Sequence, residues 1–372
     1  MARSDRDIDH KADALRFCVV SGAIPYLEVQ IASAVDLTSD EKVLTDIDVL
    51  GLRLGPDGST HRLLFDCKSS KIPPMSRAFW LAGLMAYVRG DEGFVILGRS
   101  AEKAHRLSAQ AINVRLFDKE GFGVYAAATD PEFPLVSSYG ADTEAWHRLA
   151  EGINTAGSMY QGLWRQLSSE VPLAREAPKR FRRILSVVRE HRGELDPVKP
   201  LHMALFTEAV LASSVLLATM VGELRNLIEL TEEQDGFTST LRYYLWGGRD
   251  GYATLQRINE LSGRAEISEF ETSIVAWPQF VQLTRSLLEA PPSVRNCCMP
   301  LRELALRFVA DAAEESDIRV GKLFARPRAR QFTHRIAAYL ATAAKLPNDF
   351  PKRLGEEVDR LVGVAERSAA VE

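Results

Sequence analysis

Two apolar, β-prone segments joined by a short run of turn-forming residues restrict the fold of this chain more than any other feature. They cover residues 45–54 and 61–67, and the sequence between them reads Gly-Pro-Asp-Gly-Ser. These residue types favour tight turns because they tolerate or pre-set the backbone angles that a turn requires. The pattern therefore predicts a β-hairpin in the first third of the chain.

The segments around this hairpin alternate between helical and extended patterns. Apolar residues at helical spacing predict a helix over 9–21, closed by Gly22, and a strand is expected over 24–32. The expected later elements are a helix over 76–89, a strand over 93–98, a helix over 100–111 with Ser100 as N-cap, and strands over 114–117 and 123–127. This order predicts an α/β domain over residues 5–130.

The pattern changes after Asp130. From residue 142 onward only helical patterns occur, interrupted by prolines, which predicts an all-α domain over residues 140–372 that binds DNA or a partner. The run 203–221 is apolar enough to consider as a membrane span. Because it contains Glu208 and leads directly into charged residues, a buried helix is expected instead, and no membrane association.

Charge and cysteine usage narrow the class of protein. The formal net charge of −4 excludes a uniformly basic nucleic-acid binder, although a local basic face stays open. Cysteines at positions 18, 67, 297 and 298 lack the spacing of a zinc site, so free thiols in a reducing cytosol are expected. Residues 1–11 are charged and have no apolar signal core, which favours a cytoplasmic protein.

Charged side chains stand at alternate positions on both strands of the predicted hairpin. Asp46 and Asp48 share one face of the first strand, and Asp66 and Lys68 share one face of the second. A tight turn near residues 57 and 58 would pair residues whose numbers sum to about 115. Asp48 is then expected opposite residue 67, between Asp66 and Lys68, and a bulge would shift this pairing by one residue.

Two adjacent carboxylates repel each other unless a cation lies between them. Carboxylate oxygens suit Mg²⁺, with Mn²⁺ as a substitute, and a magnesium ion keeps waters for chemistry. Lys68 would orient such a water or help to deprotonate it, and would stabilise charge on a phosphate. The alternative is an ordinary salt bridge of strand-end acids with Lys68. Three aspartates inside apolar strands break the β-propensity rule, which favours a functional site.

The hairpin motif Asp48…Asp66-Cys67-Lys68, after a helix and strand and before further helices and strands, resembles the PD-(D/E)XK (restriction-endonuclease-like) nuclease superfamily over about residues 5–128. The resemblance implies an α/β fold with a central mixed sheet flanked by helices. It further implies that Asp48 and Asp66 are metal ligands, that the Cys67 backbone carbonyl is a further ligand, and that Lys68 is catalytic.

Many members of this superfamily place a glutamate on the first helix. In this sequence Asp13 is the nearest equivalent, and Glu28 on the following strand is a second candidate. A solvent-exposed helix acid explains Asp13 equally well.

The resemblance implies a Mg²⁺-dependent DNA endonuclease in bacterial phage defence or restriction. A homodimer is expected because two cuts need two sites. Any ATPase or sensor of a defence system must be another chain, since no P-loop is visible. Two alternatives stay open: a non-catalytic nuclease-fold module that binds nucleic acid or assembles a complex, and an RNase or structure-specific resolvase.

Basic and hydroxyl residues outside the motif are candidates for phosphate contact, with an exposed loop or a solvated helix face as the alternative. Arg77, Arg89 and Arg99 form no interpretable pattern. The nucleic-acid-binding candidates are Ser69, Ser70 and Lys71 after the motif, and Lys179, Arg180, Arg182, Arg183, Arg326, Arg328 and Arg330 in the helical region.

Overall fold

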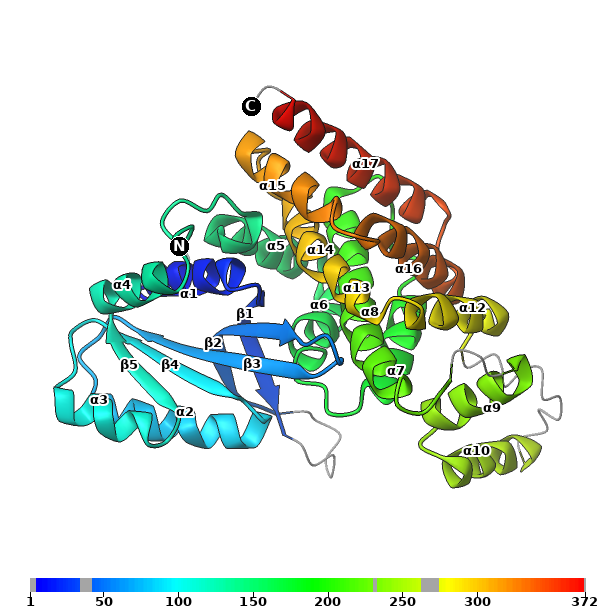
Figure 1. Cartoon of the computed structure of the whole chain (residues 1–372), viewed down its shortest axis with the longest axis horizontal. Coiled ribbons are helices and arrows are strands. Elements are labelled where there is room, and N and C mark those ends of the chain that lie inside the picture. The colour runs from blue at the N-terminus through cyan, green and yellow to red at the C-terminus, as the bar shows by residue number, and fades with distance from the viewer. Residues whose placement is uncertain (1–4, 34–41, 230–232, 262–273, 371–372) are drawn as a thin grey trace. The chain divides into compact units, whose positions relative to one another are not determined.

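The computed structural model describes residues 5–33, 42–229, 233–261 and 274–370 of the chain. The chain divides into two compact units (Figure 1). The first comprises Met1–Arg53 and Thr60–Ser158, and the second comprises Leu54–Ser59 and Met159–Glu372. The loop of the predicted hairpin is therefore grouped with the second unit, while its strands belong to the first.

A five-stranded mixed sheet forms the centre of the first unit, with its strands side by side in chain order. The first two strands are antiparallel, and the third, fourth and fifth run parallel to one another. The strands are β1 (Ile24–Ala32), β2 (Val43–Leu54), β3 (Thr60–Lys68), β4 (Glu92–Leu97) and β5 (Val114–Asp118). The expected sheet and its hairpin, β2 and β3, are confirmed.

Helices cover both faces of this sheet (Figure 1). On one face lie α1 (Ile8–Val20) and α4 (Lys119–Thr129), and on the other lie α2 (Pro74–Val88) and α3 (Lys103–Gln110). The short helix η1 (Tyr139–Ala141) and α5 (Thr143–Ala156) pack against α1. Aromatic rings of Phe17, Phe65, Phe94 and Phe122 fill the core between the sheet, α1 and α4.

Two local expectations for this unit are wrong. Residues 123–127 are helical, inside α4, because the Asp118 side chain caps the helix by accepting from the Gly121 N–H, and Phe122 and Ala126 bury one helical face. Helix α3 begins at Lys103 instead of after Ser100, and its N-cap residue makes no side-chain cap.

Every described element from residue 158 onward is helical, as expected for this region. These elements are α6 (Ser158–Arg165), the π-helical η2 (Gln166–Glu170), α7 (Ala177–Glu190), α8 (Pro200–Leu224), α9 (Gln234–Leu245), α10 (Arg249–Leu261), α12 (Trp277–Leu288), α13 (Pro291–Val294), η4 (Arg295–Cys297), α14 (Cys298–Arg307), α15 (Glu314–Phe324), α16 (Ala329–Ala344) and α17 (Asp349–Ala369).

Helix α8 is the centre of the second unit. Its 25 residues are long and apolar enough to cross a membrane, but 94% of its most apolar window is buried inside the protein. Helices α7, α14 and α16 surround it. The expected buried helix over 203–221 is confirmed, and the carboxylate of Glu208 inside it pairs with Arg302 of α14.

Candidate active site

The alternation of side chains along β3 directs Asp66 away from the aromatic core. Phe65 faces α1, since its ring centroid lies 6.1 Å from that of Phe17. Neighbouring residues on a strand point to opposite faces, so Asp66 and Lys68 face the side covered by α2. The packing of Phe65 in the apolar core thus fixes the direction in which Asp66 and Lys68 point.

The turn of the hairpin sets which residue of β2 lies across from Asp66. The Gly55 N–H donates to the Ser59 carbonyl over 2.8 Å, so partner numbers at the turn sum to 114. Continued along the strands without a bulge, this register would place Asp48 opposite Asp66, one residue from the expected partner Cys67. The shift is the one that the sequence left open, and it arises because the turn is centred on one residue instead of between two.

Lys68 lies between the two aspartates. Its Nζ is 2.8 Å from Asp48 Oδ2 and 3.6 Å from Asp66 Oδ1, and Asp7 Oδ2 lies 4.0 Å away. Burial alone would lower the pKa of Lys68, but the carboxylates of Asp48, Asp66 and Asp7 outweigh it and hold that pKa above its ordinary value. The three residues predicted as catalytic are therefore brought together, with Lys68 positively charged at neutral pH.

Asp48 is held by the strand beside it. The Cys67 backbone N–H donates to Asp48 Oδ2 over 2.7 Å, which fixes the carboxylate against β3. Burial raises the pKa of Asp48, and the charge of Lys68 offsets only part of that rise. A cation at this position would therefore stabilise the ionised carboxylate further.

Asp66 is held by an arginine from the first turn of α2. Arg77 donates from Nε to Oδ2 over 2.7 Å and from Nη2 to Oδ1 over 2.5 Å, a bidentate pair with a carboxylate that is only 2% exposed. The guanidinium also lies 4.2 Å above the Trp80 ring. Burial would lower the pKa of Arg77, but the hydrogen bonds to Asp66 raise it instead.

A second lysine approaches the site from α1. Lys11 Nζ lies 2.8 Å from both Asp5 Oδ2 and Glu28 Oε1, and 4.0 Å from Asp48 Oδ1. Burial would lower the pKa of Lys11, but these carboxylates raise it well above its ordinary value. Lys11 is therefore a permanent positive charge beside Asp48.

Glu28 adopts an unusual backbone conformation for its residue type. Its φ of +52° lies in the left-handed region, and the regular pairing of β1 with β2 passes from Leu27 to Val29 around it. A left-handed backbone strains a residue that has a Cβ, and such strain is common at functional sites. Of the two candidates for a further acidic ligand, Glu28 is the one near Asp48, because Lys11 lies close to both carboxylates.

Asp13 points elsewhere. Its Oδ1 accepts a hydrogen bond from Arg16 over 3.2 Å on the same helix. Two residues along an α-helix are turned by roughly 200°, so Asp13 cannot share the face on which Lys11 meets the sheet.

The residues around the hairpin carry two more negative than positive formal charges, since five carboxylates stand against three cations. The carboxylates are Asp5, Asp7, Glu28, Asp48 and Asp66, and the cations are Lys11, Lys68 and Arg77. One divalent cation would neutralise this cluster.

A magnesium ion fits the donor types of this site. Within the described ranges, no group of three or more His, Cys, Asp or Glu side chains converges as a metal site. Mg²⁺ is commonly held by one or two carboxylates with waters completing its shell, so Asp48 and Asp66 suffice by chemistry. The Cys67 carbonyl, the further ligand that the resemblance implies, follows Asp66 directly on β3.

Two charged residues of the site, Lys11 and Arg77, were not predicted from the sequence. Lys11 had a detectable signal, because it occupies the apolar stripe of α1 together with Ala14, Leu15 and Cys18. A lysine in such a stripe needs acidic partners when the helix packs. Arg77 had no local signal, since only the packing of α2 against the sheet brings it to Asp66.

The residues predicted to contact phosphate after the motif lie on an exposed segment. Ser69, Ser70 and Lys71 are exposed, and the Ser69 N–H donates to Asp7 Oδ1 over 2.7 Å. This segment connects β3 to α2 and begins directly after Lys68.

The basic residues predicted for nucleic-acid contact in the second unit differ in their surroundings. Those with a partner inside the unit are Arg180 with Glu170, Arg182 over the Trp246 ring, Arg183 with Glu190 and Arg330 with Asp359. Lys179, Arg326 and Arg328 are exposed, as are the paired Arg183 and Arg330. Lys179, Arg326 and Arg328 are the better candidates for phosphate contact, because the paired residues would have to give up an existing interaction.

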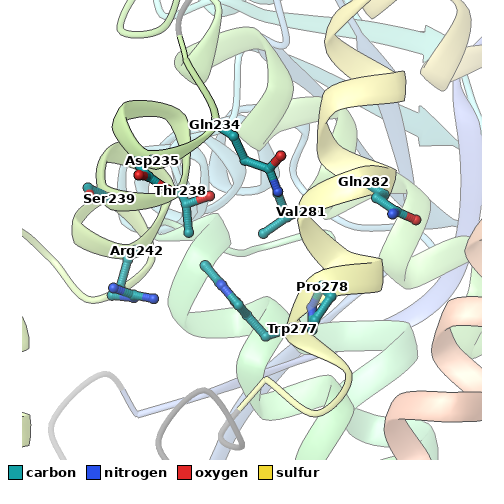
Figure 2. A pocket seen from close by; sticks show the side chains of 9 residues that line it. All are labelled: Gln234, Asp235, Thr238, Ser239, Arg242, Trp277, Pro278, Val281 and Gln282. Carbon is teal, nitrogen blue, oxygen red and sulfur yellow. The ribbon is translucent and has the colours of Figure 1, made fainter. Parts of the chain in front are cut away.

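A cavity of about 430 Å³ lies between α9 and α12 of the second unit (Figure 2). Asp235 and Arg242 bring opposite charges to its lining, beside the Trp277 ring and neutral polar groups. None of the residues predicted for the site belongs to its lining. Its mixed lining favours no single ligand class.

Comparison with known proteins gave no relative: no family model matches the sequence, and neither does any curated protein or any solved structure.

Proposed function

We propose that this chain is a Mg²⁺-dependent nuclease of the PD-(D/E)XK type that hydrolyses phosphodiester bonds of DNA. One observation carries the proposal. Two buried aspartates on one hairpin face share a single lysine, at the end of β3 in a mixed sheet that helices cover on both faces. Buried carboxylates held side by side are costly unless a cation binds there.

In this proposal Asp48, Asp66 and the Cys67 carbonyl hold the metal ion. When bound, Mg²⁺ supplies the positive charge that polarises a phosphoryl oxygen and lowers the pKa of a water. The chain's own contribution is to orient the carboxylates. The Cys67 N–H and the Lys68 ammonium do this for Asp48 over 2.7 and 2.8 Å.

Lys68 acts as a cation in this proposal. The surrounding carboxylates hold the pKa of Lys68 above its ordinary value in the metal-free protein. In this proposal its ammonium group stabilises negative charge on the phosphate. Deprotonation of the attacking water then falls to a carboxylate or to solvent. Of the two roles expected for Lys68 from the sequence, this proposal assigns it charge stabilisation on the phosphate and not deprotonation of the water.

The proposal also includes a biological role, an oligomeric state, a partner and a location for the protein. A role in phage defence or restriction, a homodimer, a separate ATPase or sensor partner and a cytoplasmic location all accompany the nuclease assignment. Support for DNA as substrate comes from the exposed segment 69–71 beside the site and from the exposed Lys179 and Arg328.

Cleavage of plasmid and linear DNA tests the proposal. Purified protein is incubated with Mg²⁺, Mn²⁺ or EDTA, beside the variant Asp66→Asn and the matched control Asp46→Asn, an exposed aspartate of the same hairpin. We expect metal-dependent cleavage by the wild type and by Asp46→Asn. A loss of more than about 100-fold is expected in Asp66→Asn, beyond the cost of losing an outer-shell partner of a metal. Cleavage that persists in EDTA or in Asp66→Asn would refute the assignment.

The second candidate is a non-catalytic module that binds nucleic acid or assembles a complex. The observation that favours it is the bidentate ion pair with Arg77, which already occupies both oxygens of Asp66. This reading predicts DNA binding without cleavage in any metal. Competition between DNA, RNA and branched DNA substrates would separate a DNA endonuclease from an RNase or a resolvase.

A further inference from the structure

The two central aspartates differ in how their oxygens are occupied. Both oxygens of Asp66 accept hydrogen bonds from Arg77, at 2.5 and 2.7 Å. Asp48 Oδ2 accepts from the Cys67 N–H and from Lys68, whereas Oδ1 of Asp48 has Lys11 only at 4.0 Å. A metal ion that binds to this pair of aspartates therefore competes mainly with Arg77, at Asp66.

Arg77 and a divalent cation cannot both bind Asp66 closely. A guanidinium and a doubly charged ion on the same carboxylate repel each other strongly, because the site is buried and water screens it poorly. Asp66 is 2% exposed, so the carboxylate has no second surface on which to hold the two cations apart. Binding of one must weaken binding of the other.

Arg77 has a second anchor that does not involve Asp66. Its guanidinium carbon lies 4.2 Å above the ring of Trp80, one turn further along α2. An arginine that loses its carboxylate would keep this stacking contact and stay beside the site. Its Nε and Nη2 donors would then be free for another anion with two acceptor oxygens, and a phosphodiester presents such a pair.

We propose that Arg77 competes with the metal ion for Asp66 and, once displaced, binds the phosphate of the nucleic acid through the same pair of donors. The inference rests on the proposed function, because it takes the Asp48 and Asp66 pair as the metal site. It makes Arg77 a substrate-positioning residue that also sets the metal affinity.

The test measures metal and DNA binding separately in the full chain. Mn²⁺ affinity is measured by titration calorimetry, and affinity for a 20-base-pair duplex by fluorescence anisotropy with Ca²⁺ in place of Mg²⁺. The variant is Arg77→Gln. The matched control is Arg115→Gln, because Arg115 also pairs with a carboxylate, Glu92, and lies over an aromatic ring, but away from the hairpin acids.

For Arg77→Gln we expect Mn²⁺ binding about tenfold tighter and DNA binding about tenfold weaker than in the wild type. Arg115→Gln should change neither. The opposite signs are diagnostic, since a merely structural Arg77 would weaken both. If Arg77→Gln unfolds in EDTA, Arg77→Lys is used, for which the same two shifts are expected at smaller size.

Two results would overturn the inference alone: Mn²⁺ affinity that is unchanged or lower in the Arg77 variant, or DNA affinity that is unchanged while Mn²⁺ binds more tightly. Wild-type protein that binds no Mn²⁺ would overturn the inference together with the metal site of the proposed function. The variant Asp66→Asn identifies the site, because it should abolish Mn²⁺ binding in both backgrounds.

Discussion

Lys68 shows how three residues of the hairpin depend on one another. It lies between two carboxylates that would repel each other without it, and they in turn keep it protonated. Such mutual dependence is expected where a protein concentrates charge for catalysis, because each group is stable only while the others are present.

Replacing Lys68 with methionine should therefore remove a charge needed in the transition state. We expect the cleavage rate of Lys68→Met to fall about 100-fold at pH 7.5, the usual effect of losing one preorganised donor. Lys71→Met, on the exposed segment just beyond, should change the rate by less than about threefold. Equal losses in the two variants, measured in single-turnover assays, would show that Lys68 has no special role.

His10 should make the stability of the protein depend on pH. It is 6% exposed on α1, and burial lowers its pKa from the ordinary value of 6.5. The unfolded chain takes up the proton first as the pH falls, so the contribution of His10 to stability is lost below about pH 6.5. Urea unfolding at pH 7.5 and 5.5 should show that the wild type loses more stability than His10→Gln. An equal loss in both would contradict this assignment.

The residues of the site were predictable where local rules fix their direction. Strand alternation places Asp66 and Lys68 on one face whatever the rest of the fold does, so sequence alone identified them. Lys11 and Arg77 required knowledge of how helices pack on the sheet. Asp13 is the opposite case, because its helix was predicted correctly but the sequence left the face that it occupies open.

At the scale of elements, α8 combines an apolar surface with one buried ion pair. Glu208 is 1% exposed and Arg302 on α14 is 0% exposed, and they form a salt bridge. Burial raises the pKa of Glu208, and the charge of Arg302 opposes that rise. The sequence predicted the buried helix from its composition, but the partner lies 94 residues further along the chain and only the packing reveals it.

Breaking this pair should destabilise the protein more than removing it whole. Arg302→Met leaves Glu208 buried without its partner, which should cost about 3–5 kcal/mol of unfolding free energy. The double variant Glu208→Leu with Arg302→Met should recover most of that loss, because apolar side chains can fill the same space. Urea denaturation of the single and double variants checks this. A double variant less stable than Arg302→Met would contradict it.

The error at α4 shows where element prediction fails. Residues 123–127 are short and apolar, and such a segment fits a strand or a buried helix equally well. The sequence signal that separates the two is Asp118, whose side chain caps the helix at Gly121. Caps thus carry information that a short apolar pattern lacks.

At the scale of the whole molecule, the fold class was predictable from the sequence. Alternating patterns in the first third and helical patterns afterwards indicated a mixed sheet followed by helices. The grouping of loop Leu54–Ser59 with the second unit could not be anticipated. The loop packs closely against α8, although the two are far apart in the sequence. The approach is so close that a Cβ added to Gly222 of α8 would lie 2.0 Å from the Asp57 carbonyl oxygen.

With a net charge of −4, the DNA binding that we propose must depend on local basic groups. We expect Arg328→Gln, at an exposed position before α16, to lower the salt dependence of DNA affinity by about one unit of log–log slope. Arg180→Gln should leave that slope unchanged, because Arg180 is held by Glu170 at 2.6 Å and by Gln166. Anisotropy titrations from 50 to 200 mM salt, roughly the range over which phosphate contacts dominate, measure both slopes. A larger slope change in Arg180→Gln would contradict this division of roles.

The central claim is that Asp48 and Asp66 form a metal site at the hairpin. Anomalous scattering from crystals grown with Mn²⁺ tests it most directly, since the manganese position is read without reference to activity. The account predicts one strong peak within about 2.3 Å of a carboxylate oxygen of both Asp48 and Asp66, typical of Mn²⁺–oxygen bonds. A peak elsewhere, or crystals saturated with Mn²⁺ that show none at the hairpin, would contradict it.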